Sequence, residues 1–165
     1  MKKKAKGDGY FFAQQTLSYK PKGAVIAQIQ PNACVAATAR MILKDIGIHI
    51  SEAELRVLFE IDEDGISPSK IPEVLAQFGL FYIYKRNLTI GDLQIALQKF
   101  PAILYVSSSL LKIIGHVIIV DGITDNFALI RDSQDGVSYK LSINDLELYW
   151  LDSATKNGRA ALRIK

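Results

Sequence analysis

The sequence is poor in the residues that most metal, redox and nucleotide sites require. Its 165 residues include one cysteine, Cys34, and two histidines. A single thiol cannot form an internal disulfide, and it leaves a cysteine-based zinc site without its usual thiolate partners. The sequence has neither a G-x-G-x-x-G motif nor a P-loop, which excludes the nucleotide sites built on those motifs. We therefore expect neither a cofactor nor a bound metal.

Long apolar runs are also missing. A membrane-spanning helix needs about 20 apolar residues, whereas the most apolar stretch, residues 113–120, is shorter and contains His116. The basic N-terminus is not followed by the apolar segment and small-residue cleavage site of a signal peptide. The sequence thus predicts neither insertion into a membrane nor export by a signal peptide.

Positive charge is concentrated at one end of the chain. Lys and Arg number 20 against 17 Asp and Glu, a formal charge of +3, but four of the lysines lie within the first six residues. The remainder is close to neutral and offers no basic face for nucleic acid. We interpret residues 1–24 as a loosely ordered basic leader or domain junction, and residues 25–165 as one domain with a single core.

Helical and strand patterns dominate different parts of this domain. Helix starts are expected at Asn32, Ser51, Ser67 and Thr89. Asn32 would be the N-cap of an alanine-rich helix over residues 33–44. Short β-prone runs separated by turns follow at residues 80–84, 102–106, 113–123, 127–132, 137–141 and 160–164. Helices followed by an antiparallel sheet are typical of an α+β fold.

Cys34 lies where a thiol can become a nucleophile. A lone cysteine in a soluble protein is most often a small buried core residue. If Asn32 caps the helix, however, Cys34 falls in the first helical turn, where free N–H groups and the helix dipole favour negative charge and lower the pKa of a thiol. We therefore take Cys34 as the candidate nucleophile.

A thiolate nucleophile needs a base, and His116 is the better of the two histidines. It interrupts an apolar strand, where a polar ring must find hydrogen-bond partners, whereas His49 lies in a polar connection. The predicted hairpin pairs His116 with a residue at 132–134, which brings Asp132 beside the ring. Asp121 is the competing acid, but it lies on the same strand as His116 and on the opposite face.

An acyl transfer to cysteine also needs hydrogen-bond donors for the oxyanion. The backbone N–H of Cys34 at a helix start is one natural donor. An uncharged side-chain amide is the natural second, and Gln28 and Gln30 lie six and four residues before the cysteine. Taken alone, both glutamines also fit an ordinary polar loop.

Together these residues resemble peptidase family C39, whose members are papain-like cysteine proteases best known from bacteriocin export transporters. The resemblance rests on Gln28 followed by five residues and Cys34, on Gly115-His116 at the start of an apolar strand, and on Asp132, and it covers residues 25–150. Three positions depart from the family pattern. Ala33 and Val35 flank the cysteine where the family usually has Asp and Gly, and Ser133 follows the acid where it often has Pro.

Residues 30–43 are more similar to the C39-like toxin domains of bacterial polymorphic toxins. The resemblance implies a papain-like α+β fold and a cysteine peptidase with a triad of Cys34, His116 and Asp132, assisted by Gln28. It further implies a protein substrate, cut after a Gly-Gly sequence, and an interbacterial effector that a secretion system delivers into the cytoplasm of the target cell. A cognate immunity protein would then cover the active site in the producing cell.

Two other functions remain open from the sequence. The same cysteine chemistry would serve a glutamine deamidase or an acyltransferase, because all three reactions share a thioester intermediate. The second alternative is a non-catalytic C39-like binding module, and the presence of Cys34 argues against it.

Overall fold

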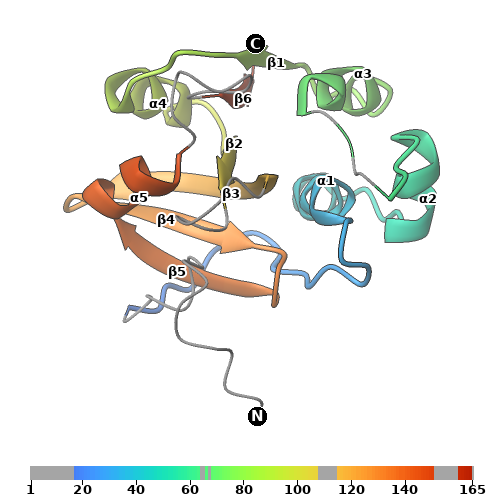
Figure 1. Ribbon diagram of the computed structural model, residues 1–165, viewed down its shortest axis with the longest axis horizontal. Helices are drawn as coiled ribbons and strands as arrows, with labels where there is room; N and C mark the ends of the chain where they lie inside the picture. The colour runs from blue at the N-terminus through green and yellow to red at the C-terminus, as the bar shows by residue number, and fades with distance from the viewer. Residues whose placement is uncertain (1–16, 64–65, 67, 108–114, 151–159, 165) are drawn as a thin grey trace.

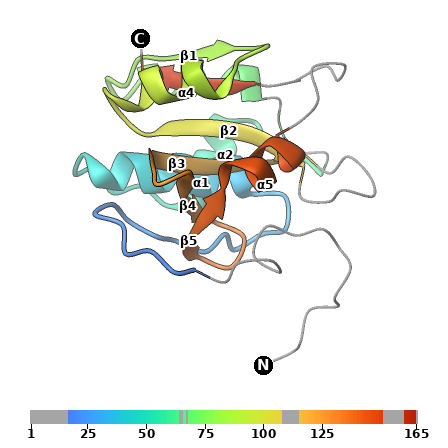
Figure 2. The ribbon, with the colours of Figure 1, turned by 90° about the vertical axis from the view of Figure 1, so that its left-hand side faces the viewer.

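The computed structural model describes residues 17–63, 66, 68–107, 115–150 and 160–164, and it places six strands in one antiparallel sheet (Figure 1). The strands are β1 (Tyr82–Lys85), β2 (Ala102–Ser107), β3 (Gly115–Thr124), β4 (Phe127–Asp132), β5 (Val137–Ser142) and β6 (Ala161–Ile164). Their order across the sheet is β1-β6-β2-β3-β4-β5. Figure 2 shows them stacked in that sense, with β1 at one end and β5 at the other. The expected α+β class is confirmed.

Helices cover both faces of the sheet. They are α1 (Cys34–Asp45), α2 (Glu52–Leu58), the 3₁₀ turn η2 (Pro68–Lys70), α3 (Ile71–Ala76), α4 (Ile90–Leu97) and α5 (Ile143–Tyr149). Apolar side chains of α1, α2 and α3 pack with Val117 and Ile119 of β3, and those of α4 and α5 pack with Ile118 and Val120. Strand β3 is therefore buried on both faces. This explains why its sequence is continuously apolar rather than alternating.

Side-chain caps begin two of the predicted helices as expected. Ser51 accepts a hydrogen bond from the backbone N–H of Glu54, and the Glu54 carboxylate accepts one from the backbone N–H of Ser51. Thr89 and Asp92 form the same reciprocal capping box at the start of α4. The predicted cap at Ser67 lies outside the described residues, and α3 itself begins at Ile71.

The predicted cap of α1 is wrong, although the helix does begin at Cys34. Ala33 occupies the N-cap position and makes no side-chain capping bond. The side chain of Asn32 turns away from the helix, donates to the carbonyl of Asp62 and accepts a hydrogen bond of 2.7 Å from Arg56 Nη1. Asn32 thus joins the loop before α1 to α2, a tertiary bond that competes successfully with the local cap.

The segment before α1 is hydrogen-bonded to the domain from residue 17 onward. The N–H of Lys140 donates to the carbonyl of Leu17, and the Ser138 hydroxyl donates to the carbonyl of Tyr19. Further along, the N–H of Ala24 donates to Asp45 at the end of α1. The boundary expected at residue 24 stays a prediction, but residues 17–24 on its leader side contact β5 and α1.

A buried cation lies beneath this segment. Arg131 of β4 is 1% exposed and contacts Asp45 and Asp121 at 2.8 Å each. Its Nη1 also donates to the carbonyl of Ala24 at 2.9 Å. The guanidinium therefore joins α1, β3, β4 and the N-terminal segment, and it is fully enclosed by opposite charge and a carbonyl.

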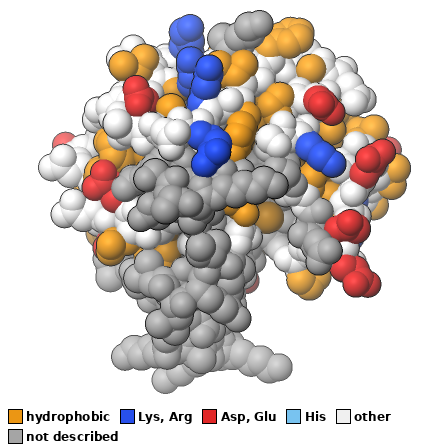
Figure 3. All heavy atoms as spheres, turned by 45° about the horizontal axis from the view of Figure 1, so that its top comes forward, with side chains coloured by type: hydrophobic (Ala, Val, Ile, Leu, Met, Phe, Trp, Pro, Cys, Tyr) orange, Lys and Arg blue, Asp and Glu red, His pale blue; other side chains and the backbone are white. Residues whose placement is uncertain are grey.

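Two further features of the described residues concern membrane-spanning helices and the charge of the surface. None of the helices among the described residues has the length and apolar character needed to cross a bilayer. The face drawn in Figure 3 carries basic, acidic and apolar side chains side by side.

Candidate active site

His116 and Asp132 meet where β3 begins and β4 ends. The distance between His116 Nε2 and Asp132 Oδ1 is 2.7 Å, and both side chains are buried. Ile119 of β3 is paired with Arg131 of β4, so Asp132 lies diagonally across from His116, as the predicted hairpin register requires. A bulge between Val120 and Gly122 shifts the register nearer the turn, beyond the pairs that place the two side chains.

Asp132 is held by three donors. Besides His116, the backbone N–H of Gln134 reaches Oδ1 at 3.0 Å, and the Tyr139 hydroxyl reaches Oδ2 at 3.0 Å. Burial would raise the pKa of Asp132, but the charge and hydrogen bond of His116, together with the two other donors, lower it below its ordinary value. The carboxylate is therefore ionised at neutral pH.

The competing acid, Asp121, has different partners. It accepts hydrogen bonds from Arg131 and from the hydroxyl of Tyr19. Because Asp121 lies on the face opposite to His116, its charge neutralises the buried guanidinium instead of orienting the imidazole.

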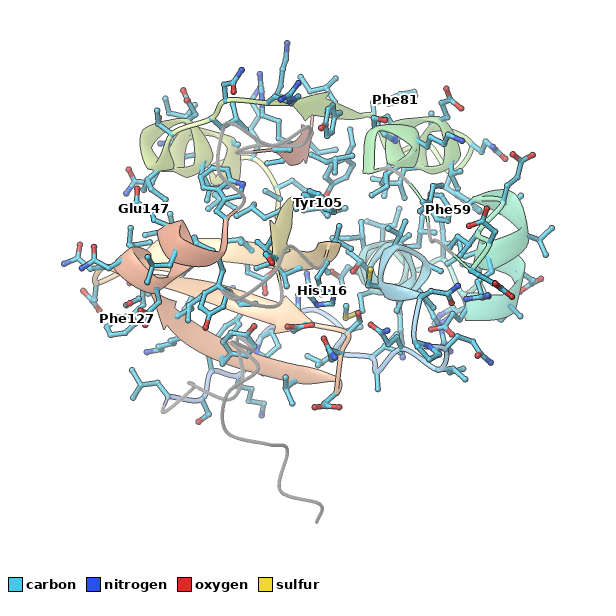
Figure 4. The ribbon with its side chains drawn as sticks, viewed as in Figure 1. Phe59, Phe81, Tyr105, His116, Phe127 and Glu147 are labelled. Carbon is cyan, nitrogen blue, oxygen red and sulfur yellow. The ribbon has the colours of Figure 1, made fainter. Side chains whose placement is uncertain are left out.

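Cys34 completes the contact with His116. Cys34 is the first residue of α1 and is partly exposed, and its thiol interacts with the His116 ring and with the backbone N–H groups of Val117 and Val35. Figure 4 shows His116 on the sheet on the side toward α1. Since Nε2 faces Asp132, the other ring nitrogen, Nδ1, is the one left for the thiol.

The two groups shift each other toward their charged forms. Burial alone would raise the pKa of the Cys34 thiol, but the hydrogen bond and charge of His116, with the N–H groups of Val117 and Val35, lower it. Burial alone would lower the pKa of His116, but Asp132 and then Cys34 raise it to about 10. Both shifts favour the pair of a thiolate and an imidazolium.

Gln28 is fixed beside the acid, in the loop that leads to Cys34. Its backbone N–H donates to the carbonyl of Ser133 at 2.7 Å, and its Oε1 accepts from the Ser133 hydroxyl at 3.0 Å. Its Nε2 donates to the carbonyls of Gln30 and Pro31. These two carbonyls fix the orientation of the amide, and one of them must release its N–H before Gln28 can donate to an oxyanion.

A buried carboxylate that the sequence analysis did not single out shapes the same loop. Glu52 is 2% exposed, and its two oxygens accept the backbone N–H groups of Ile29 and Gln30. In the sequence it is indistinguishable from a solvent-facing glutamate in the first turn of α2. Ser133 and Tyr139 were missed for the same reason, since their partners are distant in the sequence.

The remaining candidates lie elsewhere. His49 is exposed and lines a shallow pocket with Arg40 and Lys44 on the far end of α1. Among the described residues, no three His, Cys, Asp or Glu side chains are grouped in a way that would hold a metal ion.

Comparison with known proteins identifies the family. The model of the peptidase C39 family matches residues 22–155, which include all four candidate site residues. No curated protein matches the chain.

Solved structures show the same fold. A double glycine motif protease from an AMS/PCAT transporter, solved in complex with the leader peptide, has a TM-score of 0.65 at 17% identity, over 98% of this chain and 95% of that one. The peptidase domain of Streptococcus ComA, a bifunctional ABC transporter involved in quorum sensing, has a TM-score of 0.67 at 20% identity, over 86% and 98%. A protein from Bacillus anthracis described as a C39-like peptidase has a TM-score of 0.66 at 12% identity, over 88% and 98%.

The family match covers most of the chain, and the fold agrees with it. The resemblance noted in the sequence is therefore confirmed at the level of the family, while these solved relatives do not bear on the toxin subtype. The chain belongs to the peptidase C39 family, a family of cysteine peptidases.

Proposed function

We propose that this chain cleaves a protein substrate with a catalytic triad of Cys34, His116 and Asp132. The observation that carries the proposal is the arrangement of the Cys34 thiol, which interacts with the buried His116 imidazole, whose Nε2 lies 2.7 Å from the buried Asp132 carboxylate. The pKa shifts of all three groups favour the charged forms that a cysteine peptidase uses.

The reaction follows from these positions. The Cys34 thiolate attacks the scissile carbonyl, and the carbonyl π electrons move onto oxygen to form the oxyanion. The His116 imidazolium then gives its proton to the leaving amine as the C–N bond breaks, which leaves a thioester and a neutral ring. The neutral ring takes a proton from water, the resulting hydroxide attacks the thioester, and the carboxylic acid and the Cys34 thiolate are released. Asp132 keeps the ring oriented and stabilises its charged form.

The oxyanion would be stabilised from two sides. The N–H groups in the first turn of α1 have no partner within the helix, and that of Cys34 lies next to the attacking sulfur. The Gln28 amide supplies the second donor once it exchanges a loop carbonyl for the oxyanion.

We further propose that the substrate is cut after a Gly-Gly sequence. The support is the family resemblance at Gln28, Cys34, His116 and Asp132, together with a solved relative described as a double glycine motif protease in complex with a leader peptide.

The test is a set of peptides with Gly-Gly at the centre and Ala-Ala controls, incubated with the wild type and with Cys34→Ala. Two fragments are expected from the wild type alone, one that ends in Gly-Gly and one that begins with the residue after it. A gain of about one mass unit without fragmentation would instead identify a glutamine deamidase, and a gain equal to the mass of an added amine less that of the ammonia released would identify an acyltransferase.

An effector role is a further proposal, and its support is the similarity of residues 30–43 to C39-like toxin domains. The domain would be delivered by a secretion system into the cytoplasm of a target bacterium, and an immunity protein covering the active site at Cys34 and His116 would protect the producer. Cytosolic expression should then arrest growth for the wild type but not for Cys34→Ala or His116→Ala. Equal harmlessness of all three proteins across several hosts would overturn the effector role and leave the peptidase proposal standing.

A further inference from the structure

The acid of the triad receives a hydrogen bond from a residue that the reaction does not itself require. Tyr139 lies at the middle of β5, opposite Ile130 of β4, and its side chain is fully buried. Its hydroxyl oxygen is 3.0 Å from Oδ2 of Asp132, while the other carboxylate oxygen, Oδ1, faces His116 and the N–H of Gln134. The two carboxylate oxygens of Asp132 thus have different hydrogen-bond partners.

We propose that Tyr139 is a positioning residue, whose hydroxyl holds Oδ2 so that Oδ1 stays directed at Nε2 of His116. The inference rests on the proposed triad. Asp132 is 1% exposed, so water does not freely replace a lost donor on Oδ2. A carboxylate held at one oxygen only rotates more freely about the bond to its methylene carbon, and the imidazole loses its fixed orientation with it.

The charged and titratable groups around Asp132 come from three elements. His116 of β3 contacts it directly, Tyr139 of β5 donates to it, and Cys34 of α1 lies beyond the His116 ring. The Tyr139 hydroxyl acts on Asp132 by donating a hydrogen bond. Removing its hydroxyl therefore changes a hydrogen bond without removing a charge.

The substitution Tyr139→Phe deletes that hydroxyl alone, and Tyr82→Phe is its matched control. Tyr82 is 3% exposed, and its hydroxyl donates to the carbonyl of Pro101 at 2.8 Å, away from the triad. Each variant removes the hydroxyl of a buried tyrosine and its hydrogen bond to the partner named above, so a fall in melting temperature is expected for both. An effect on His116 or on activity that is seen in Tyr139→Phe and not in Tyr82→Phe then arises from the hydrogen bond to Asp132.

The readout is the Nε2–H proton of His116, followed by NMR as the pH is lowered. With two histidines in the chain, a His49→Gln variant assigns the signal. In the wild type the downfield signal should persist until Asp132 is protonated. Because a donor to the charged form lowers the pKa of a carboxyl, Tyr139→Phe should lose the signal at a pH higher by about one unit, and Tyr82→Phe should not.

The outcomes separate the two proposals. An unchanged midpoint in a folded Tyr139→Phe, or the same shift in Tyr82→Phe, overturns the role of Tyr139 and leaves the triad intact. A wild type without the Nε2–H signal overturns the triad itself and the role of Tyr139 with it. If Tyr139→Phe does not fold, 3-fluorotyrosine at position 139 is the second variant. It is a stronger donor and should move the midpoint to lower pH, and no movement would refute the proposal.

Discussion

At the scale of single residues, the thiol of Cys34 gives the most direct test of the ion pair. Iodoacetamide should alkylate it rapidly at pH 7, well below the ordinary thiol pKa of about 8.5, because His116 and two backbone N–H groups favour the thiolate. In His116→Ala the largest remaining influence on the Cys34 thiol is burial, which raises its pKa. The pH midpoint of alkylation should therefore move above that of a free thiol. A wild-type midpoint equal to that of a free cysteine would contradict the ion pair.

Substitutions of Asp121 in β3 and of Asp132 at the end of β4 should have opposite effects on turnover and stability. Asp132→Asn keeps the shape but removes the charge that holds the imidazolium, and turnover should fall about 10²-fold with little change in KM. Asp121→Asn should leave turnover near wild type and cost roughly 1.5–3 kcal/mol of unfolding free energy, because Arg131 loses a buried partner. Urea unfolding and peptide kinetics on both variants check this; the reverse ranking would mean that Asp121 is the catalytic acid.

Gln28 and Gln30 were equivalent candidates in the sequence, and the structure separates them. Gln28 is fixed by Ser133 next to the acid, whereas the side chain of Gln30 is exposed. Gln28→Ala should lower kcat by about 10²-fold or more, and Gln30→Ala should leave kcat close to wild type. Steady-state kinetics with one substrate settles the comparison, and equal losses would exclude an oxyanion role for the Gln28 amide.

At the scale of elements, the sequence predicts what local chemistry determines. The capping boxes at Ser51 and Thr89 and the pairing of β3 with β4 depend on residues a few positions apart or on one turn, and all are present. The cap of α1 failed because Asn32 binds Arg56, 24 residues away. Glu52 and Tyr139 likewise owe their roles to partners that no local pattern reveals.

The segment of residues 17–24 tests this limit directly. In sequence it looks like part of a basic leader, yet its backbone is bonded to β5 and its Ala24 contacts both Arg131 and Asp45. Deleting residues 1–24 should therefore lower the unfolding free energy by roughly 2–4 kcal/mol, the sum of a few buried hydrogen bonds. The matched control is deletion of residues 1–16. Equal stability of the two shortened proteins, measured by urea unfolding, would show that the contacts of residues 17–24 contribute nothing to the unfolding free energy.

At the scale of the whole molecule, the ion pair determines how stability depends on pH. The unfolded chain has a histidine with a pKa near 6.5 and a thiol near 9.0, whereas in the fold that of His116 is raised to about 10 and that of Cys34 is lowered. Between pH 6.5 and 9 the unfolded pair carries one proton, on Cys34, and the folded pair also carries one, on His116, wherever the pH exceeds the lowered pKa of the Cys34 thiol. Where the proton counts are equal, the contribution of the pair to stability does not change with pH.

Outside the window the contribution falls on both sides. Below pH 6.5 the unfolded histidine takes up a proton, so stability is lost as the pH falls for as long as the thiol in the fold stays ionised, and protonation of Asp132, whose pKa is lowered in the fold, adds to this loss. Above pH 9 the unfolded thiol loses its proton while His116 still holds one, so stability is lost as the pH rises toward 10. Each proton of difference corresponds to about 1.4 kcal/mol per pH unit.

Removing the thiol should abolish the plateau and the part of the loss below pH 6.5 that comes from the unfolded histidine, and it should keep the loss that comes from protonation of Asp132 and the decline above pH 9. In Cys34→Ala, Asp132 still raises the pKa of His116, but no thiol proton in the unfolded chain balances it. The unfolding free energy should therefore decline from pH 6.5 to 9 in this variant, at up to about 1.4 kcal/mol per unit, while that of the wild type stays level. Urea unfolding at half-unit intervals of pH measures both curves. Parallel curves across the window would mean that the thiol and the imidazole are not coupled in the fold, whatever the activity of the protein.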